Sequence, residues 1–183
     1  MPSQYFSVAD QDRARYSTHE NNPDDPGYVQ FLSQIFHPMD QSIPNWNSAS
    51  RALDYGSGPN PVLVRLLLER GIPTDHYDLF FQPDRSLLQK NYPLVISTEV
   101  VEHFKNPRAD WADLLSFVSS KGHLVVMTQL HQGLEHFEKW WYPKDFTHVT
   151  FYSEKTVRWI AARFGLEMLY IEKSVIVFAK SFS

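Results

Sequence analysis

The 183-residue sequence contains no cysteine, so disulfide bonds and thiolate-bound metals are excluded. This absence is compatible with a reducing compartment. No apolar run approaches the roughly 20 residues of a membrane-spanning helix. The N-terminal stretch MPSQYFSVADQDRAR has no apolar core of signal-peptide length. We therefore expect a cytoplasmic protein with no membrane-spanning segment.

An excess of basic charge is also missing. The chain has 17 Lys and Arg against 21 Asp and Glu, for a formal net charge of −4. A large phosphate-binding surface needs the opposite balance, so the composition favours a small molecule over RNA as the partner. With 43% apolar residues, the chain is long enough for one domain with a substantial core.

The first 49 residues differ in pattern from the rest. Residues 1–24 are polar, and we expect them to be loosely ordered. A single amphipathic helix is predicted at 26–37, where apolar side chains recur every three or four residues. These side chains are Tyr28, Phe31, Leu32, Ile35 and Phe36. We expect residues 1–49 to form a tail and an accessory helix over the cleft of a second unit, residues 50–183.

Strand and helix signals alternate from residue 50 onward. Strands are predicted at 52–55, 75–80, 94–97 and 123–128, and loop-like sequence at 129–150. Helices are expected to begin after Asn60-Pro61, after Asn106-Pro107 and after Ser153, and two of them to end at Gly71 and Gly165. The short connection between 168–171 and 175–179 predicts an antiparallel hairpin. The fold class is thus α/β, a doubly wound Rossmann-like sheet closed by this hairpin.

Two glycines follow the first predicted strand in LDYGSGPNPVLVRLLL, residues 53–68. Gly56 and Gly58 permit positive φ and let backbone N–H groups approach a ligand at a helix N-terminus. The dinucleotide fingerprint G-x-G-x-x-G fails, because Pro61 stands near its third glycine. Asp54 would also repel a pyrophosphate. Both features disfavour a nucleotide-dependent oxidoreductase.

The run Asp54-Tyr55-Gly56-Ser57-Gly58 resembles the first motif of class I S-adenosylmethionine-dependent methyltransferases. The resemblance covers about residues 50–180. It implies that Gly56, Ser57 and Gly58 pass beside the methionine part of S-adenosylmethionine. It further implies that Asp54 helps to order this loop and the amino group of the cofactor.

Asp78 follows the second predicted strand, 22 residues after Gly56. A carboxylate near this spacing can accept two hydrogen bonds from ribose hydroxyls. The alternatives are that Asp78 is a surface turn residue or that Asp75 takes the role. Only about twelve residues separate Phe81 from Leu94, so the third strand of the family's sheet is short or missing. The acid that commonly contacts adenine is therefore left unassigned.

The stretch STEVVEHF, residues 97–104, places Glu99, Glu102 and His103 at i, i+3 and i+4. On a helical turn these side chains share one face. The spacing E-x-x-E-H resembles a motif of small-RNA 2′-O-methyltransferases and of ubiquinone-pathway O-methyltransferases. The resemblance implies that Glu99, Glu102 and His103 bind a divalent cation, Mg²⁺ or Mn²⁺, with a further histidine from downstream. That histidine is predicted to be His148, with two alternatives, His131 and His136.

Other roles for the same residues remain open. Without a metal, His103 or His148 is a candidate general base. Glu99 is also a candidate cofactor contact, and His103 a candidate helix cap. In the aromatic stretch 136–152 we expect Tyr142 and His148 to face the cleft, while most of the rings cover the sheet edge.

The resemblance thus predicts a methyltransferase that uses S-adenosylmethionine to methylate an oxygen of a small molecule. Glu102, His103 and His148 are the expected catalytic residues, and the assisting divalent metal is expected at Glu99, Glu102, His103 and His148. The alternative is a non-catalytic module with the same fold that binds the cofactor or a partner, since fold alone does not dictate function.

Overall fold

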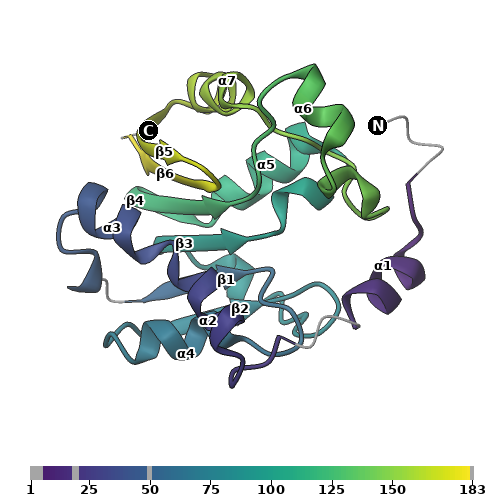
Figure 1. Ribbon diagram of the computed structural model, residues 1–183. Coiled ribbons are helices and arrows are strands. Elements are labelled where there is room, and N and C mark those ends of the chain that lie inside the picture. The colour runs from purple at the N-terminus through teal and green to yellow at the C-terminus, as the bar shows by residue number, and fades with distance from the viewer. Residues whose placement is uncertain (1–5, 18–20, 49–50, 182–183) are drawn as a thin grey trace.

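The computed structural model describes residues 6–17, 21–48 and 51–181. At its centre lies a six-stranded sheet in the order β2-β1-β3-β4-β6-β5 (Figure 1). The strands are β1 Ala52–Tyr55, β2 Thr74–Tyr77, β3 Tyr92–Thr98, β4 Val118–Met127, β5 Leu166–Glu172 and β6 Val175–Lys180. Strands β1 to β4 are parallel, whereas β6 runs antiparallel to both β4 and β5.

This topology confirms the predicted doubly wound sheet with its C-terminal hairpin. The missing third strand is confirmed too. β2 is the edge of the sheet, and the described chain beyond it has only a bridge from Asp78 to Gln82 and a 3₁₀ turn at Leu87–Gln89 before β3.

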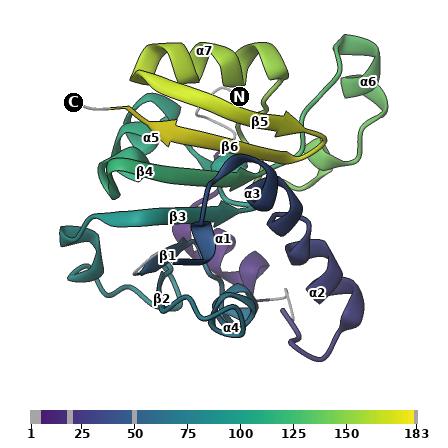
Figure 2. The same ribbon diagram turned by 90° about the vertical axis from the view of Figure 1, so that its left-hand side faces the viewer.

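Seven α-helices surround the sheet in the described part of the chain. They are α1 Ala9–Tyr16, α2 Pro26–Ser33, α3 Phe36–Ser42, α4 Val62–Leu68, α5 Pro107–Ser116, α6 Leu134–Lys139 and α7 Glu154–Phe164. Figure 2 shows α2, α3 and α4 on one face of the sheet and α5 on the other, with α7 beside the β5–β6 edge. None of the helices in the described ranges is long and apolar enough to cross a membrane.

The sheet separates two hydrophobic cores because successive strand residues point to opposite faces. In β3, Leu94 and Ile96 pack in the core beneath α2, α3 and α4, while Val95 packs in the core of α5 and α7. All three are at most 2% exposed. A central parallel strand covered on both faces reads as an unbroken apolar run, which explains why this strand was recognisable from sequence.

The ends of α7 agree with expectation, whereas those of α4 do not. In α7 the Ser153 hydroxyl accepts from the Thr156 N–H, and Gly165 ends the helix with φ +65°. In α4, however, Pro61 takes the N-cap position and the helix begins at Val62, because the ψ of Pro61, +70°, is not helical. Its C-cap is Glu69, so the assignment of Gly71 as the cap was wrong.

The N-terminal part contains more structure than predicted. The expected single helix at 26–37 is two helices, α2 and α3, which are interrupted after Ser33. Residues 9–16, expected to be loosely ordered, form α1. The expected loop at 129–150 contains α6. α1 is mostly polar and has no regular apolar spacing, which is why apolar periodicity did not reveal it.

The sheet topology also locates the site. From β1 the chain passes to β2 on one side, and β3 then returns to the other side of β1. Such a reversal opens a crevice at the carboxyl ends of the strands. The glycine turn after β1 and the acidic–histidine segment after β3 both lie there.

Candidate active site

A cavity of about 650 Å³ opens at the carboxyl ends of β1, β2 and β3. Its walls come from the glycine turn, from the segments after β2 and β3, and from α1 and α2. Asp54, Gly56, Ser57, Gly58, Asp78, Glu99, His103 and His148 all line it. The structure therefore brings these predicted site residues to one cavity, whereas the buried Glu102 does not line it.

The glycine turn is held in shape by β2. The N–H groups of Gly56 and Ser57 both donate to the Tyr77 carbonyl, at 2.8 and 3.2 Å. Gly56 has φ +84°, and a Cβ added there would lie 2.3 Å from Val100 Cγ2. Backbone conformation and close approach thus both require glycine at position 56.

Asp78 makes local bonds with both oxygens of its carboxylate. Oδ1 accepts from the N–H groups of Phe80 and Phe81 at 2.8 and 3.1 Å, and Oδ2 accepts from the Gly58 N–H at 2.9 Å. Asp78 is half-buried and faces the cavity. It therefore joins the turn after β2 to the glycine turn, a contact that sequence spacing does not reveal. Its predicted role toward ribose hydroxyls stays a prediction.

Asp54 lies almost fully buried, 2% exposed, at the floor of the cavity. Its Oδ1 has no hydrogen-bond partner among the described residues. Burial, and then the negative charge of Asp78, raises the pKa of Asp54 to about 7. A cationic group beside Oδ1 would stabilise the carboxylate form.

Glu99 follows β3 in the left-handed backbone region, with φ +54°. This conformation interrupts any helical path, so Glu99 does not share a helical face with Glu102 and His103. Burial, and then the charge of Glu102, raises the pKa of Glu99 to about 9. Its Oε1, like Asp54 Oδ1, has no partner in the described structure.

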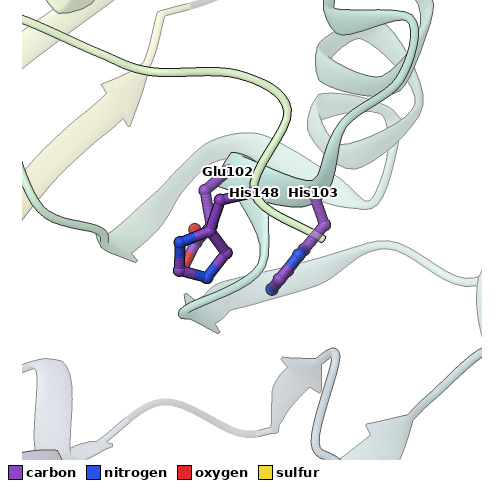
Figure 3. Close-up of side chains that lie close together, drawn as sticks. All are labelled: Glu102, His103 and His148. Atoms are coloured by element: carbon purple, nitrogen blue, oxygen red, sulfur yellow. The ribbon is translucent and has the colours of Figure 1, made fainter. Parts of the chain in front are cut away.

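Glu102, His103 and His148 form a compact cluster (Figure 3). One ligand atom from each lies within 4.8 Å of the others, and the two imidazole centroids are 4.9 Å apart. Of the three candidate downstream histidines, this cluster includes His148, and neither His131 nor His136 belongs to it. Glu99 lies outside the cluster of three but is connected to it through Tyr142.

Backbone bonds bring the two histidines together. The 3₁₀ turn Val101–His103 carries Glu102 and His103. The carbonyl of Glu102 accepts from the N–H groups of Val149 and Thr150, both at 2.9 Å. These bonds dock the segment that carries His148 against the turn.

Both imidazoles are oriented by backbone carbonyls. His103 Nδ1 lies 3.0 Å from the Thr147 oxygen, and His148 Nδ1 lies 2.9 Å from the Tyr142 oxygen. A carbonyl only accepts, so each Nδ1 donates, and each Nε2 keeps its lone pair while the ring is neutral. Burial lowers the pKa of both histidines, which favours that neutral form. Neutral imidazoles fixed in this way suit metal ligation or general-base catalysis.

A hydroxyl network behind the cluster was not predicted from sequence. Tyr142 is fully buried rather than facing the cleft, so that expectation was wrong. Its hydroxyl donates to Glu102 Oε1 at 2.5 Å and lies 3.2 Å from Glu99 Oε2. Thr128 donates to Glu102 Oε2 at 3.0 Å. Trp141, next in sequence to Tyr142, lines the cavity instead and is 57% exposed.

Burial raises the pKa of Glu102, whose carboxyl is fully enclosed. Hydrogen bonds from Tyr142 and Thr128 and the proximity of His148 act in the opposite direction. Paired carboxylates and imidazoles in one buried cluster are typical of metal-binding and catalytic sites.

Comparison with known proteins identifies the family. Residues 7–171 match the profile of a family described as a methyltransferase domain. A search of curated proteins found no match. Among solved structures, an O-methyltransferase family protein from Burkholderia thailandensis is similar with a TM-score of 0.61 at 11% identity, over 96% of this chain and 64% of that one. The chain thus spans somewhat less than two thirds of that protein.

Two other similar structures match over most of their length. A SAM-dependent methyltransferase from Archaeoglobus fulgidus has a TM-score of 0.58 at 15% identity, over 84% of this chain and 99% of that one. Magnesium protoporphyrin IX methyltransferase from Synechocystis, with bound SAH, has a TM-score of 0.60 at 17% identity, over 97% of each chain. These likenesses show the shared fold, and the profile match shows the family: the chain belongs to the S-adenosylmethionine-dependent methyltransferases.

Proposed function

We propose that this protein transfers the methyl group of S-adenosylmethionine to an oxygen of a small molecule, with assistance from a divalent cation. The observation that carries the proposal is the cluster of Glu102, His103 and His148 beside the cavity, with ligand atoms within 4.8 Å of one another. S-adenosylmethionine supplies an electrophilic methyl group on a positively charged sulfur.

The cavity fits this cofactor. Its volume of about 650 Å³ lies within the range typical of small-molecule sites. The unpartnered Oδ1 of Asp54 offers an anionic contact for the amino group, and Gly56 gives a close backbone approach where a Cβ would clash. In this proposal Gly56, Ser57 and Gly58 border the methionine part of the cofactor, and Asp78 binds its ribose. Glu99 lies between the cofactor and the cation.

The cluster fits a divalent cation with mixed nitrogen and oxygen ligands. Glu102 would supply one oxygen, and His103 and His148 their Nε2 atoms. Carboxylate oxygens suit Mg²⁺, whereas imidazole nitrogens shift the preference toward Mn²⁺. A cation at this position would bind acceptor oxygens and lower the pKa of a hydroxyl. In its absence, Nε2 of His103 or His148 would accept the hydroxyl proton.

The charge of the cavity supports a small-molecule acceptor over RNA. Its described lining includes seven acidic residues and two basic ones. The acids are Asp12, Asp54, Asp78, Glu99, Asp110, Asp113 and Asp145. The two bases, Arg15 and Lys105, each form an ion pair with an acid of the same wall. A phosphate backbone would meet net negative charge here.

The alternative is a non-catalytic module with the same fold, and the missing third strand favours it. β2 is the edge strand of the sheet. The cavity therefore lacks the part of its wall that a further strand beyond β2 would supply.

Turnover separates the two. We expect conversion of S-adenosylmethionine to S-adenosylhomocysteine with a panel of hydroxylated small molecules and Mn²⁺ or Mg²⁺. A chelator should lower the rate, and His148→Gln should lower it about 100-fold or more. His131→Gln, which changes a histidine outside the cluster, is the matched control. No turnover with any acceptor would favour the binding module, and chelator-insensitive turnover would leave the histidines as general bases.

A further inference from the structure

Helix α1 makes few apolar contacts, chiefly that of the Tyr16 ring with Phe80, whose centroids are 5.7 Å apart. Its sequence, ADQDRARY, has no apolar face, and its one buried residue is the acid Asp12, 6% exposed. An isolated helix of eight residues is not stable in water. Polar contacts therefore supply most of the attachment of α1 to the cavity wall, and their partners show which segments the helix binds.

Arg15 binds the turn that precedes His148. Its Nε and one terminal nitrogen both donate to Asp145 Oδ2, at 3.1 and 2.7 Å. The Asp145 side chain is only 8% exposed. The other oxygen, Oδ1, accepts from the Thr147 N–H at 3.0 Å and from the Thr147 hydroxyl at 2.6 Å.

This turn orients both imidazoles. The Thr147 carbonyl accepts from His103 Nδ1 at 3.0 Å. The His148 N–H donates to the Asp145 carbonyl at 3.0 Å. Arg15 is therefore connected through one carboxylate and one threonine to His103, and through one backbone bond to His148.

A second set of contacts joins α1 to the segment after His103. Lys105 Nζ lies 2.7 Å from Asp12 Oδ2 and also donates to the Ser7 carbonyl at 2.7 Å. The Tyr16 ring lies edge-on to His103, with centroids 5.1 Å apart. α1 thus contacts each of the two segments that carry a histidine.

We propose that Arg15 of α1 is a positioning residue, which acts through Asp145 and Thr147 to hold His103 and His148 in the orientation that places a ligand atom of each ring within 4.8 Å of the other and of Glu102. Asp12, through Lys105, holds the other side of the same arrangement. This inference deepens the proposed function, since it concerns how the cation site is held. The N-terminal segment is then part of the active site rather than a cover over it.

The direct test compares Arg15→Ala with Arg13→Ala. Both variants remove one arginine from α1, but Arg13 is exposed. The readout is the imidazole tautomer in the metal-free protein, measured by long-range ¹H–¹⁵N correlation at one fixed pH. His103→Gln and His148→Gln assign the two signals. In wild type and Arg13→Ala, both rings should be Nδ1–H tautomers, whereas in Arg15→Ala the His103 signal should move toward the other tautomer.

Calorimetric titration with Mn²⁺ gives the second readout. Loss of a residue that orients metal ligands typically costs 10- to 100-fold in metal affinity, so Arg15→Ala should weaken Mn²⁺ binding by about that factor. Arg15→Lys, which keeps one contact to Asp145, should recover part of the loss. Thermal unfolding of each variant checks that the fold is retained.

The two proposals fail in different ways. Tautomers and Mn²⁺ affinity in Arg15→Ala that equal those of Arg13→Ala would overturn the role of Arg15. Wild-type protein that binds no Mn²⁺ would contradict the proposed metal assistance, and the tautomers of the metal-free protein would still decide whether Arg15 positions the histidines.

Discussion

At the scale of single residues, a comparison of two glycines with nearly equal φ distinguishes the cost of backbone strain from the cost of steric contact. Gly56 has φ +84° and its added Cβ would meet Val100, whereas Gly71 has φ +80° and nothing within 4 Å of such an atom. We expect Gly71→Ala to lower the free energy of unfolding by about 1–2 kcal/mol, from backbone strain alone. Gly56→Ala should lower it further. Chemical denaturation of both variants measures the difference, and equal losses would contradict the tight fit at position 56.

Asp54 should make stability depend on pH. Burial raises its pKa from the ordinary range of an aspartate to about 7 in the folded protein, so the folded state binds a proton that the unfolded state releases. The resulting stabilisation is fully present below about pH 4 and is lost as pH rises toward about 7. We expect Asp54→Asn to be more stable than wild type at pH 8 by roughly 2–4 kcal/mol, and by less at pH 5.

Urea unfolding at the two pH values measures this effect. Asp24→Asn, which removes an exposed acid, is the control for net charge and should show no such pH-dependent gain. An Asp54→Asn variant less stable than wild type at pH 8 would contradict the burial of an unpartnered carboxylate. The charge that acts on Asp54 is that of Asp78, which raises its pKa further.

Sequence patterns predicted the roles of those residues whose positions depend on their neighbours along the chain. Gly56 and Ser153 are read from the turn and the cap that they form. His148 was chosen from three histidines because it stands just before the helix that Ser153 caps, and the structure places it in the cluster with Glu102. Thr128 and the buried orientation of Tyr142 were missed, because both depend on tertiary contacts of Glu102 across the sheet edge.

At the scale of helices and strands, prediction succeeded where burial imposes a regular pattern of apolar residues along the chain. β3 is apolar on both faces and was evident, and the β5–β6 hairpin followed from its short connection. α1 was missed because its contacts are ion pairs, Asp12 with Lys105 and Arg15 with Asp145, which leave no periodic apolar signal.

The division of residues 26–37 between α2 and α3 shows another limit of sequence patterns. The apolar residues on both sides of the break pack in the same core, so their spacing reads as one continuous helix. The break falls just before Pro38, which lies in the first turn of α3 and has no N–H to donate to the carbonyl four residues earlier.

At the scale of the whole molecule, the cavity is assembled from both parts of the chain. Residues 50–183 supply the strand ends that carry the glycine turn and the cluster, while α1 and α2 supply a wall. Figure 1 shows α1 beside the carboxyl ends of the parallel strands. A site built across the N-terminal segment and the sheet explains why motifs alone predicted the floor of the cavity but not the side formed by α1.

The central claim is that this cavity binds the methyltransferase cofactor. Calorimetric titration of the purified protein with S-adenosylhomocysteine, repeated after chelator treatment, tests it most directly. We expect binding in the micromolar range in both conditions, because the contacts proposed for Asp54 and the glycine turn need no metal. If the protein bound no S-adenosylhomocysteine both before and after chelator treatment, this result would contradict the claim. The glycine turn would then have only a structural role.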